Sequence, residues 1–346
     1  MESALRLLIV DDSKLMRDAL VGIFADDENI MIETASDGFE ALALLDVFKP
    51  DVITLDINMP ELDGISTLKR IMIDQPVPTI MLSSLAQEGA KITFDALRYG
   101  AVDFISKPSA ISDISLEEQK QAIRSRVEYA AKVELGAIKY IRHKSGNEQT
   151  KADFNNNHCH HLVALGAAEG GYGALLKIIP QLSSSPGVAY LVSLHVPTEF
   201  VDAFIGYLNS YSQVEVKHAA HNEVIKPGCC YISSGDNYMS VHSELEDYVL
   251  HISSAPFINR RGAIDMLFFS TAESIKDHAV GVILSGLGED GAEGLEEIIR
   301  VGGTALAQDP SSCLCNEMVE IAMSRSQVAI VETDSRIAAG INKLVN

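Results

Sequence analysis

Short apolar strands alternate with amphipathic helices twice along this chain of 346 residues. The first alternation runs from Leu5 to about Ile141, and the second begins near His161. This order is typical of parallel sheets, because each return to a parallel strand needs a crossover that is usually a helix. Between the alternations, residues 143–160 contain few apolar side chains and break the periodicity. We therefore predict an α/β domain over residues 1–142, a linker over 143–160 and a second α/β domain over 161–346.

The second alternation differs from the first in its middle. Two strand-like segments, 238–243 and 247–253, follow each other with only a short break. We expect them to form an antiparallel hairpin or a sheet edge. The rest of this half predicts a doubly wound α/β domain with a parallel sheet. No internal repeat joins the two halves.

Charge and hydropathy exclude two kinds of partner. The chain has 27 Lys and Arg against 48 Asp and Glu, a formal net charge of −21, and both halves are acidic. Because neither half offers a basic face to phosphates, we predict no nucleic-acid binding. No apolar run reaches the roughly 18–20 residues of a membrane span, and the first residues lack the pattern of a secretion signal. We expect no membrane insertion and a cytoplasmic location.

Cysteine and histidine do not form a metal motif in this sequence. The five cysteines are few, odd in number and partly adjacent, which favours reduced thiols. Cys313 and Cys315 lack the second pair of ligands that a zinc site needs. The run HCHH at 158–161 is rich in ligand types, but such close neighbours cannot easily converge on one tetrahedral ion. We interpret that run as part of the linker.

Carboxylates follow two strands of the first predicted sheet. Asp11 and Asp12 come after the strand 5–10, and Asp56 ends the strand that begins at residue 52. Because strands 1 and 3 of such a sheet are neighbours, the three carboxylates should converge. Their mutual repulsion favours a dication, and Mg²⁺ prefers carboxylates, carbonyls and waters. We predict a Mg²⁺ site with Asp12, Asp56 and the carbonyl of Asn58 as ligands, and with Asp11 acting through water.

A hydroxyl and an ammonium group approach the same edge from the other side. Ser83 ends the fourth strand, and Lys107 follows the fifth. Together they would hold a phosphoryl group whose charge Mg²⁺ and Lys107 neutralise. A single Asp after a strand is more often a helix cap, and a single Lys is usually a surface residue; here four elements deliver such groups to one edge. A cis bond between Lys107 and Pro108 would suit the tight turn there.

These motifs carry a family resemblance. The segments DDS at 11–13, LDINMPELDG at 55–64, MLSS at 81–84, GAVDF at 100–104 and SKP at 106–108 resemble the receiver domain of two-component response regulators, from residue 5 to about 125. The resemblance implies a flavodoxin-like (βα)5 fold and phosphorylation of Asp56 by a partner histidine kinase. It further implies that Ser83 and Phe104 couple the phosphoryl group to a switch surface.

The second domain has a glycine-rich turn where enzymes often place a nucleophile. We expect the stretch LGAAEGGYGAL, residues 165–175, to join a buried strand to a helix and to expose Ala168 and Glu169 on its turn. His195 and Asp290 follow two other strands, so a base and its orienting carboxylate are available without a nucleophile. Each has a simpler interpretation: His195 as a structural residue and Asp290 as a helix N-cap.

The order of these pieces resembles the catalytic domain of chemotaxis methylesterases across about residues 160–346. That family hydrolyses glutamate methyl esters on chemoreceptors, and many members deamidate receptor glutamines. Its nucleophile loop, Gly-Ala/Ser-Ser-Thr/Ala-Gly-Gly, falls on GAAEGG at 166–171. The resemblance therefore places the catalytic serine on Ala168, the histidine on His195 and the aspartate on Asp290. Leu287 lies in the turn that supplies an oxyanion-stabilising N–H.

Several departures accompany the missing serine. Glu169 replaces a small residue and adds negative charge where an oxyanion would develop, which opposes catalysis. Tyr172 replaces a proline, and the family's His-Arg-Pro-Ser-Val-Asp reads RRGAID at 260–265. Natural divergence explains this set better than an engineered serine-to-alanine change. Ser193 and Ser285 lie on the wrong elements to substitute as nucleophiles.

Two functions are compatible with this sequence. We favour a response regulator whose methylesterase-like domain lacks hydrolase activity and acts by binding or regulation, with a histidine kinase and chemoreceptor cytoplasmic helices as candidate partners. The pair Arg260-Arg261 would contact an acidic partner, or would be a solvated turn. The alternative is an active protein-glutamate methylesterase and glutamine deamidase. In that case the serine was lost by engineering, or another nucleophile such as Glu169 acts with His195.

Overall fold

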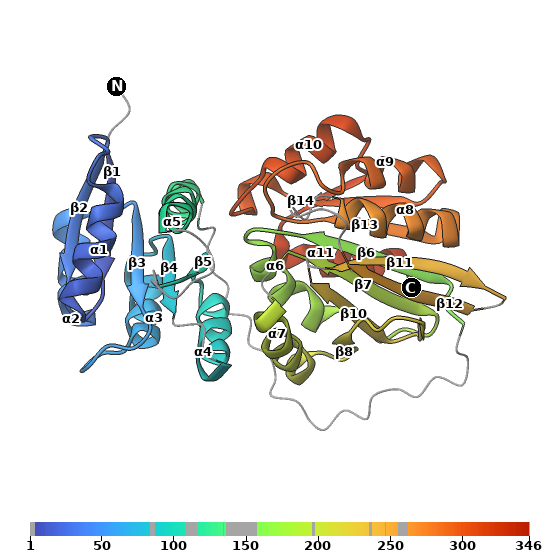
Figure 1. Cartoon of the computed structure of the whole chain (residues 1–346), viewed down its shortest axis with the longest axis horizontal. Coiled ribbons are helices and arrows are strands. Elements are labelled where there is room, and N and C mark those ends of the chain that lie inside the picture. Colours follow the sequence, from blue (N-terminus) through green and yellow to red (C-terminus); the bar gives the residue numbers. More distant parts are fainter. Residues whose placement is uncertain are drawn as a thin grey trace. The chain divides into compact units, whose positions relative to one another are not determined.

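The computed structural model divides the chain into two compact units, Met1–Ile141 and Arg142–Asn346 (Figure 1). Each unit is an α/β structure built around its own sheet. The residues that the structure describes are 4–83, 87–107, 116–133, 135, 158–195, 198–234, 237–245, 247–254 and 262–345.

The first unit contains a five-stranded parallel sheet in the order β2-β1-β3-β4-β5. Residues 7–10 of β1 and all of β3 are buried, which is typical of parallel strands covered on both faces. This order confirms the prediction of a flavodoxin-like fold with strands 1 and 3 as neighbours. The strands are β1 (Leu5–Val10), β2 (Ile30–Ala35), β3 (Val52–Asp56), β4 (Thr79–Ser83) and β5 (Asp103–Ser106), and the helices are α1 (Lys14–Phe24), α2 (Gly38–Phe48), α3 (Gly64–Asp74), α4 (Gln87–Arg98) and α5 (Leu116–Ala130).

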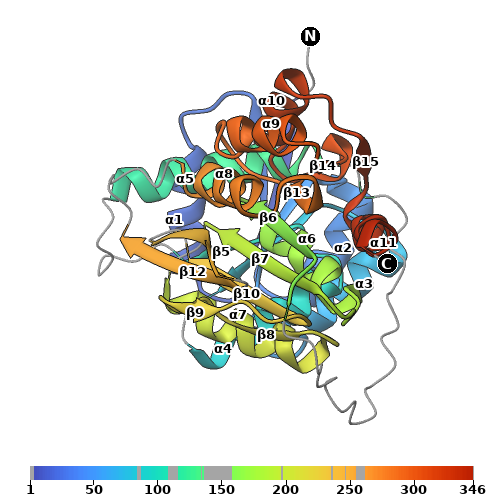
Figure 2. The same ribbon diagram turned by 90° about the vertical axis from the view of Figure 1, so that its right-hand side faces the viewer.

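The second unit contains a seven-stranded parallel sheet in the order β15-β14-β13-β6-β7-β10-β8, in which β6 and β7 run side by side (Figure 2). From β6 the chain crosses to β7, and from β13 it crosses in the opposite direction to β14. Because such crossovers are right-handed, α6 and α9 lie on opposite faces, as in a doubly wound sheet. The strands are β6 (His161–Ala167), β7 (Val188–Leu194), β8 (Glu215–His218), β10 (Cys229–Ser234), β13 (Ala279–Ile283), β14 (Thr304–Gln308) and β15 (Ile330–Glu332).

Helices and short 3-10 turns connect the strands of the second unit. Helix α8 packs against β6 and α9, and α6 packs against α11. The helices are α6 (Gly171–Ile178), α7 (Thr198–Tyr211), α8 (Ala263–Ile275), α9 (Ala292–Arg300), α10 (Glu317–Arg325) and α11 (Asp334–Val345), and the turns are η1 (Ile179–Gln181), η2 (Lys276–His278) and η3 (Pro310–Ser312).

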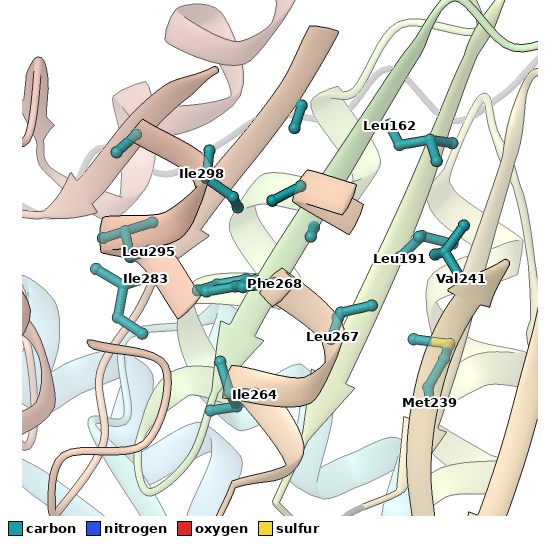
Figure 3. Close-up of a cluster of buried hydrophobic side chains, with 14 of the residues drawn as sticks. Leu162, Leu191, Met239, Val241, Ile264, Leu267, Phe268, Ile283, Leu295 and Ile298 are labelled. Atoms are coloured by element: carbon teal, nitrogen blue, oxygen red, sulfur yellow. The ribbon is translucent and has the colours of Figure 1, made fainter. Parts of the chain in front are cut away.

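An antiparallel sheet completes the second unit, as the predicted hairpin required. It has the order β11-β12-β9, formed by β11 (Asn237–Glu244), β12 (Asp247–Ser254) and β9 (Glu223–Val224). Met239 and Val241 of β11 point into the core, where α8 contributes Ile264, Leu267 and Phe268 (Figure 3). The side chains of Met239 and Val241 are buried on this face, whereas Ser240 between them is half-buried and His242 is exposed.

The packed part of the second unit begins inside the segment predicted as linker. The side chain of Cys159 is only 2% exposed, and its Sγ donates a hydrogen bond to the Ile225 carbonyl at 3.8 Å. The backbone N–H of His160 donates to the Gly187 carbonyl at 2.6 Å. The linker interpretation of HCHH was wrong here, because a buried cysteine packs like a small apolar residue. Residues 143–157 lie outside the described part of the chain.

No helix among the described residues is long and apolar enough to cross a membrane.

Replacing Phe268 by alanine tests the α8 core. This ring is fully buried, so Phe268→Ala should lower the free energy of unfolding by about 3–5 kcal/mol. Its neighbour Phe269 is 38% exposed, and Phe269→Ala should cost less than about 1 kcal/mol. Urea unfolding of both variants measures the difference. Equal losses would show that α8 does not bury the face seen here.

Candidate functional site

Acidic side chains meet at the carboxyl edge of the first sheet. Asp11 follows β1 and is fully buried, Asp56 ends β3 with 2% exposure, and Asp12 is exposed. The register pairs Val10 with Leu55, which brings the ends of these two strands together. One ligand oxygen from each aspartate lies within 4.8 Å of those of the other two.

Lys107 joins this acidic cluster. Its Nζ lies 2.8 Å from Asp11 Oδ2 and 2.9 Å from Asp56 Oδ1. Burial opposes its charge, but the hydrogen bonds to both carboxylates raise the pKa of Lys107 above its usual value. Burial also raises the pKa of Asp56, and Lys107 offsets part of that rise. Among the described residues, one ammonium group thus pairs with two of the three carboxyl groups, which leaves the cluster with a net negative charge.

The donor set fits Mg²⁺. Asp11, Asp12 and Asp56 offer only hard carboxylate oxygens, which suit this ion better than softer metals. The carboxylate of Asp56 accepts a hydrogen bond from the backbone N–H of Asn58, so the backbone of Asn58 lies beside this carboxylate. The Asn58 carbonyl as a further ligand stays a prediction.

A glycine lets the helix after β3 approach this edge. A Cβ at Gly64 would lie 2.0 Å from the backbone oxygen of Asp56, which no other residue could accommodate without displacing the strand end. The motif at 55–64 therefore shapes the backbone around Asp56 as well as supplying its carboxylate.

The other predicted receiver residues lie at the ends of β4 and β5. The register pairs Ser83 with Ser106, but the side chain of Ser83 lies outside the described part of the chain, as does the Lys107–Pro108 bond. Phe104 is buried with 7% exposure. Arg126 of α5 donates to its carbonyl at 2.9 Å, a contact that the sequence did not indicate.

The glycine-rich loop of the second unit is held against the end of β13. The N–H of Ala168 donates to the Ser285 carbonyl at 3.0 Å. Because this contact holds the loop against the end of β13, the predicted exposure of Ala168 was wrong, and its side chain is only 1% exposed. Gly170 has φ +78°, and a Cβ there would lie 2.5 Å from Leu314 Cβ, so only glycine fits. Tyr172 is buried in α6. The loop is well packed, with a methyl group at the position predicted for the nucleophile.

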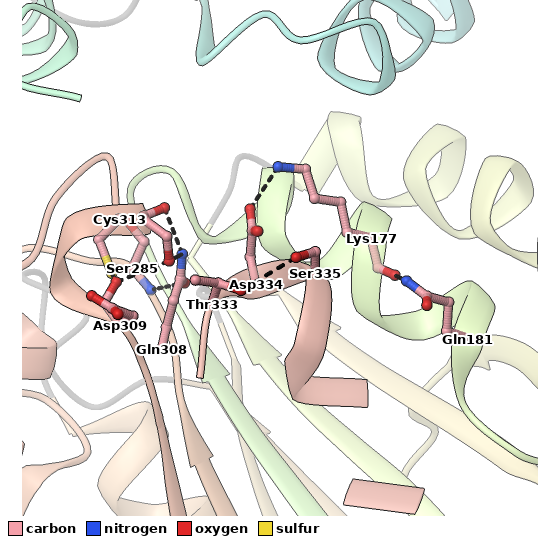
Figure 4. A network of polar contacts seen from close by, with 10 residues as sticks. Lys177, Gln181, Ser285, Gln308, Asp309, Cys313, Thr333, Asp334 and Ser335 are labelled. Carbon is pink, nitrogen blue, oxygen red and sulfur yellow. Dashed lines mark hydrogen bonds and ion pairs between the residues drawn. The ribbon is translucent and has the colours of Figure 1, made fainter. Parts of the chain in front are cut away.

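Neither nearby serine replaces the missing hydroxyl. Ser193 is buried within β7. Ser285 is fully buried; its Oγ lies 2.8 Å from the Glu169 carbonyl and accepts the N–H of Cys315 at 3.0 Å. Its own N–H donates to Gln308 Oε1 at 3.0 Å, within the polar network of Figure 4. Ser285 therefore fixes the loop and is not an available nucleophile.

His195 and Asp290 meet at the same edge. His195 Nε2 lies 3.4 Å from Asp290 Oδ2, and the N–H of His195 donates to the Ala167 carbonyl at 3.0 Å. Asp290 also accepts the N–H groups of Ile264 and Asp265, at 3.2 and 3.0 Å. Asp290 thus contacts His195 and caps the first turn of α8. The interpretation of Asp290 as a local N-cap was wrong, since Gly291 occupies that position before α9.

Asp265 makes the reciprocal contact. Its Oδ1 accepts the N–H of Gly294 in the first turn of α9 at 2.7 Å. Burial raises the pKa of Asp265 to about 6; the Gly294 hydrogen bond lowers it, and the charge of Asp290 raises it. No local pattern in the sequence indicated this pairing, because the two aspartates are far apart along the chain.

Two glutamates occupy the turn predicted to bind an oxyanion. Leu287 donates its N–H to Glu169 Oε2 at 3.3 Å. The next residue, Gly288, donates its N–H to Glu317 Oε2 at 3.1 Å. Sequence reasoning anticipated the charge of Glu169 near this turn but missed Glu317, which α10 supplies. The position of Arg260-Arg261 lies outside the described residues.

Comparison with family models gives two matches that together span most of the chain. The model described as response regulator receiver domain matches residues 7–117. The model described as CheB methylesterase matches residues 163–341, which is about half of the chain.

Relatives cover almost the full length. A protein of Pyrococcus horikoshii named protein-glutamate methylesterase/protein-glutamine glutaminase is 35% identical, over 99% of this chain and 94% of its own. A protein of the same name from Escherichia coli is 36% identical, over 97% of this chain and 95% of its own. The crystal structure of the Thermotoga maritima CheB methylesterase catalytic domain has a TM-score of 0.51 and 29% identity, covering 54% of this chain and 98% of that one.

The pKa of Asp265 predicts a stability change with pH. In the folded chain its carboxyl holds a proton up to about pH 6, whereas the unfolded chain loses it near the ordinary value of 3.8. The free energy of unfolding should therefore fall as the pH rises between these values. Asp265→Asn can still accept the Gly294 N–H and should remove this fall.

Urea unfolding across that pH range measures the effect. Glu296→Gln, on the exposed side of α9, is the matched control and should keep the wild-type slope. A slope in Asp265→Asn equal to that of the unmodified chain would contradict the assignment.

Proposed function

We propose that this chain, which belongs to the CheB methylesterase family and carries a response regulator receiver domain, is a response regulator. We further propose, from Ala168 and the hydrogen bond between Glu169 and Leu287, that its methylesterase-like domain acts by binding without hydrolysis. In this proposal a partner histidine kinase donates a phosphoryl group to Asp56. The output of the second domain is contact with a protein partner, and chemoreceptor cytoplasmic helices are the candidate.

The acidic cluster supports phosphorylation of Asp56. A carboxylate oxygen of Asp56 attacks the phosphorus of the donor, the bond to the donor's leaving group breaks, and Asp56 carries the phosphoryl group. Asp12, Asp56 and the Asn58 carbonyl would hold Mg²⁺, with Asp11 acting through water; the ion would neutralise phosphoryl charge. Lys107, now bound to Asp11 and Asp56, is placed to contact the phosphoryl oxygens.

The phosphoryl group would change the charge at this edge. It adds about −1.5 to −2 at neutral pH. Ser83 and Phe104 are proposed to couple this change to a switch surface. Arg126 of α5 donates a hydrogen bond to the Phe104 carbonyl and so connects β5 to α5.

The hydrogen bond between Glu169 and Leu287 carries the proposal of a silent domain. A hydrolase of this type needs the N–H of Leu287 free for an oxyanion, but the Glu169 carboxylate accepts it at 3.3 Å. A negative charge there opposes the transition state. Ala168 offers no nucleophile, and removal of the serine from a Ser-His-Asp system costs about 10⁶ in kcat.

One observation favours the alternative, an active methylesterase and deamidase. His195 and Asp290 remain within 3.4 Å of each other, as a base and its orienting group would be. In this alternative the serine was lost by engineering, or Glu169 acts as the nucleophile or as a base with His195. Its hydrogen bond to Leu287 argues against this, because a donated N–H stabilises the carboxylate and lowers its nucleophilicity.

Phosphorylation should require Asp56. With acetyl phosphate and Mg²⁺, the full chain should gain one phosphoryl group, and Asp56→Asn should gain none. Asp12→Asn should need more Mg²⁺ for the same extent of labelling, because it removes one hard ligand. Intact-protein mass spectrometry follows the product. Labelling of Asp56→Asn to the wild-type extent would place the acceptor elsewhere.

Restoring the serine alone should not restore hydrolysis. Ala168→Ser should release little methanol from a methylated receptor fragment, because Glu169 still holds the Leu287 N–H. The double variant Ala168→Ser, Glu169→Ala should hydrolyse the ester at least about 100-fold faster than Ala168→Ser alone, because one oxyanion donor is worth about 10²–10³ in kcat.

Two further variants complete this test. His195→Ala on the double background should abolish the regained activity, which separates the active-site reaction from contaminating hydrolases. Turnover by the unmodified chain above the background rate would refute the silent domain.

A further inference from the structure

One arginine of α1 contacts the backbone of the loop that carries Asp11 and Asp12. Arg17 lies in the first turn of this helix and is half-buried. Its Nη1 donates hydrogen bonds to the carbonyls of Asp11 and Asp12, at 2.6 and 3.2 Å. Hydrogen bonds from a charged donor are stronger than those from a neutral one. The guanidinium therefore fixes the backbone between β1 and α1, through a contact that the sequence did not indicate.

The peptide group between Asp12 and Ser13 transmits this contact to a carboxylate. In a trans peptide the C=O and N–H bonds point in opposite directions, so a fixed Asp12 carbonyl also orients the Ser13 N–H. That N–H donates to Asp11 Oδ1 at 2.9 Å. The other oxygen, Asp11 Oδ2, lies 2.8 Å from Lys107 Nζ. Arg17 thus holds one side of a peptide whose other side aligns the Asp11 carboxylate.

A surface ion pair does not explain the position of Arg17. In the described part of the chain it forms no ion pair with a carboxylate. Glu40 is close enough for electrostatic interaction, but its carboxylate accepts the N–H and the hydroxyl of Ser36, both at 2.7 Å. These two hydrogen bonds are the main reason that the pKa of Glu40 is lowered, and the charge of Arg17 adds a small part. The loop carbonyls are therefore the partners that Arg17 Nη1 holds.

Orientation of the carboxylates matters for a small, hard cation. Mg²⁺ demands near-ideal octahedral geometry, so a rotated ligand binds it poorly. Groups that hydrogen-bond to the ligands of a metal fix their direction, and the loss of such a group typically costs about 10- to 100-fold in affinity. Asp12 is exposed, so little packing holds its side chain. Its direction therefore depends on the backbone that Arg17 contacts.

We propose that Arg17 is a positioning residue for a divalent cation held by the three aspartates of the acidic cluster. By fixing the two carbonyls before an ion arrives, it reduces the ordering that binding requires. Its own positive charge would repel the ion, so the gain comes from geometry alone. This inference rests on the proposed function of the first unit, because it takes the cluster as the cation site that supports phosphorylation of Asp56.

Binding of Mn²⁺ to the unphosphorylated full chain tests this inference without any reaction. Mn²⁺ replaces Mg²⁺ because both ions prefer oxygen ligands, and electron paramagnetic resonance of the free ion gives the dissociation constant. Since the whole chain is acidic, the binding that Asp12→Asn weakens identifies the site. We expect Arg17→Met to raise the dissociation constant of that binding at least about tenfold.

Two further variants separate geometry from charge. Arg17→Lys keeps the positive charge but loses the planar guanidinium, and it should weaken binding at least about fivefold. Lys14→Met removes an exposed charge from the same helical turn, where Lys14 pairs with Asp18 at 3.0 Å. It should change the dissociation constant less than about twofold, because exposed charges are screened. Tighter binding in Arg17→Met together with unchanged binding in Arg17→Lys would overturn the inference.

Labelling with acetyl phosphate distinguishes positioning from a general structural role. At saturating Mg²⁺, Arg17→Met should gain as much phosphoryl group as the unmodified chain. The Mg²⁺ concentration for half-maximal labelling should rise by about the factor seen for Mn²⁺. Loss of labelling at every Mg²⁺ concentration would show that Arg17 maintains the fold and would overturn the inference.

The Asp12→Asn variant separates this inference from the proposed function. If Asp12→Asn weakens Mn²⁺ binding and Arg17→Met does not, the positioning role is refuted and the cation site stands. If neither substitution changes Mn²⁺ binding, the acidic cluster is not the cation site, and both proposals fail.

Discussion

Each of the two parallel sheets reverses its winding direction once, and the candidate chemistry lies at that reversal. In the first sheet, β1 connects outward to β2 while β3 connects the other way to β4. In the second, β6 leads to β7 and β13 leads back to β14. The loops leaving such a pair of strands diverge to opposite faces and open a crevice between them. Asp11 and Asp56 lie at the first reversal, and at the second Glu169, in the loop after β6, contacts Leu287.

Carboxylates determine the behaviour of both edges, but their partners differ. In the first unit, Asp11 and Asp56 share a single ammonium group, so the cluster retains a demand for cationic charge. In the second unit, Asp290, Asp265 and Glu169 accept backbone N–H groups from helix ends and from a turn. These dipoles satisfy the carboxylates without an ion. Carboxylates therefore indicate a metal site at the edge of the first sheet. At the edge of the second sheet they themselves occupy the backbone N–H groups that could bind an anion.

Hydrophobic periodicity and the residues at strand ends were enough to predict both sheets and the approach of Asp11 to Asp56. Periodicity is a local property, and parallel pairing brings the carboxyl ends of neighbouring strands to the same edge. The burial of Cys159 was missed, because a cysteine within a run of three histidines suggests a polar, exposed segment. Glu317 and the Asp265–Asp290 pair were also missed. Each contact joins residues from elements distant in the chain, and its hydrogen bond depends on side-chain direction that no spacing rule encodes.

The Glu169 carboxylate occupies the Leu287 N–H that a methylesterase would keep for its oxyanion. Amide hydrogen exchange at Leu287, measured by NMR on the unmodified chain and on Glu169→Ala, tests this contact directly. Exchange at Leu287 should be at least about fivefold faster in Glu169→Ala, because the acceptor that protects this N–H is gone, whereas exchange at Gly288, held by Glu317, should change little. Equal exchange rates at Leu287 in the two proteins would show that Glu169 does not close this site.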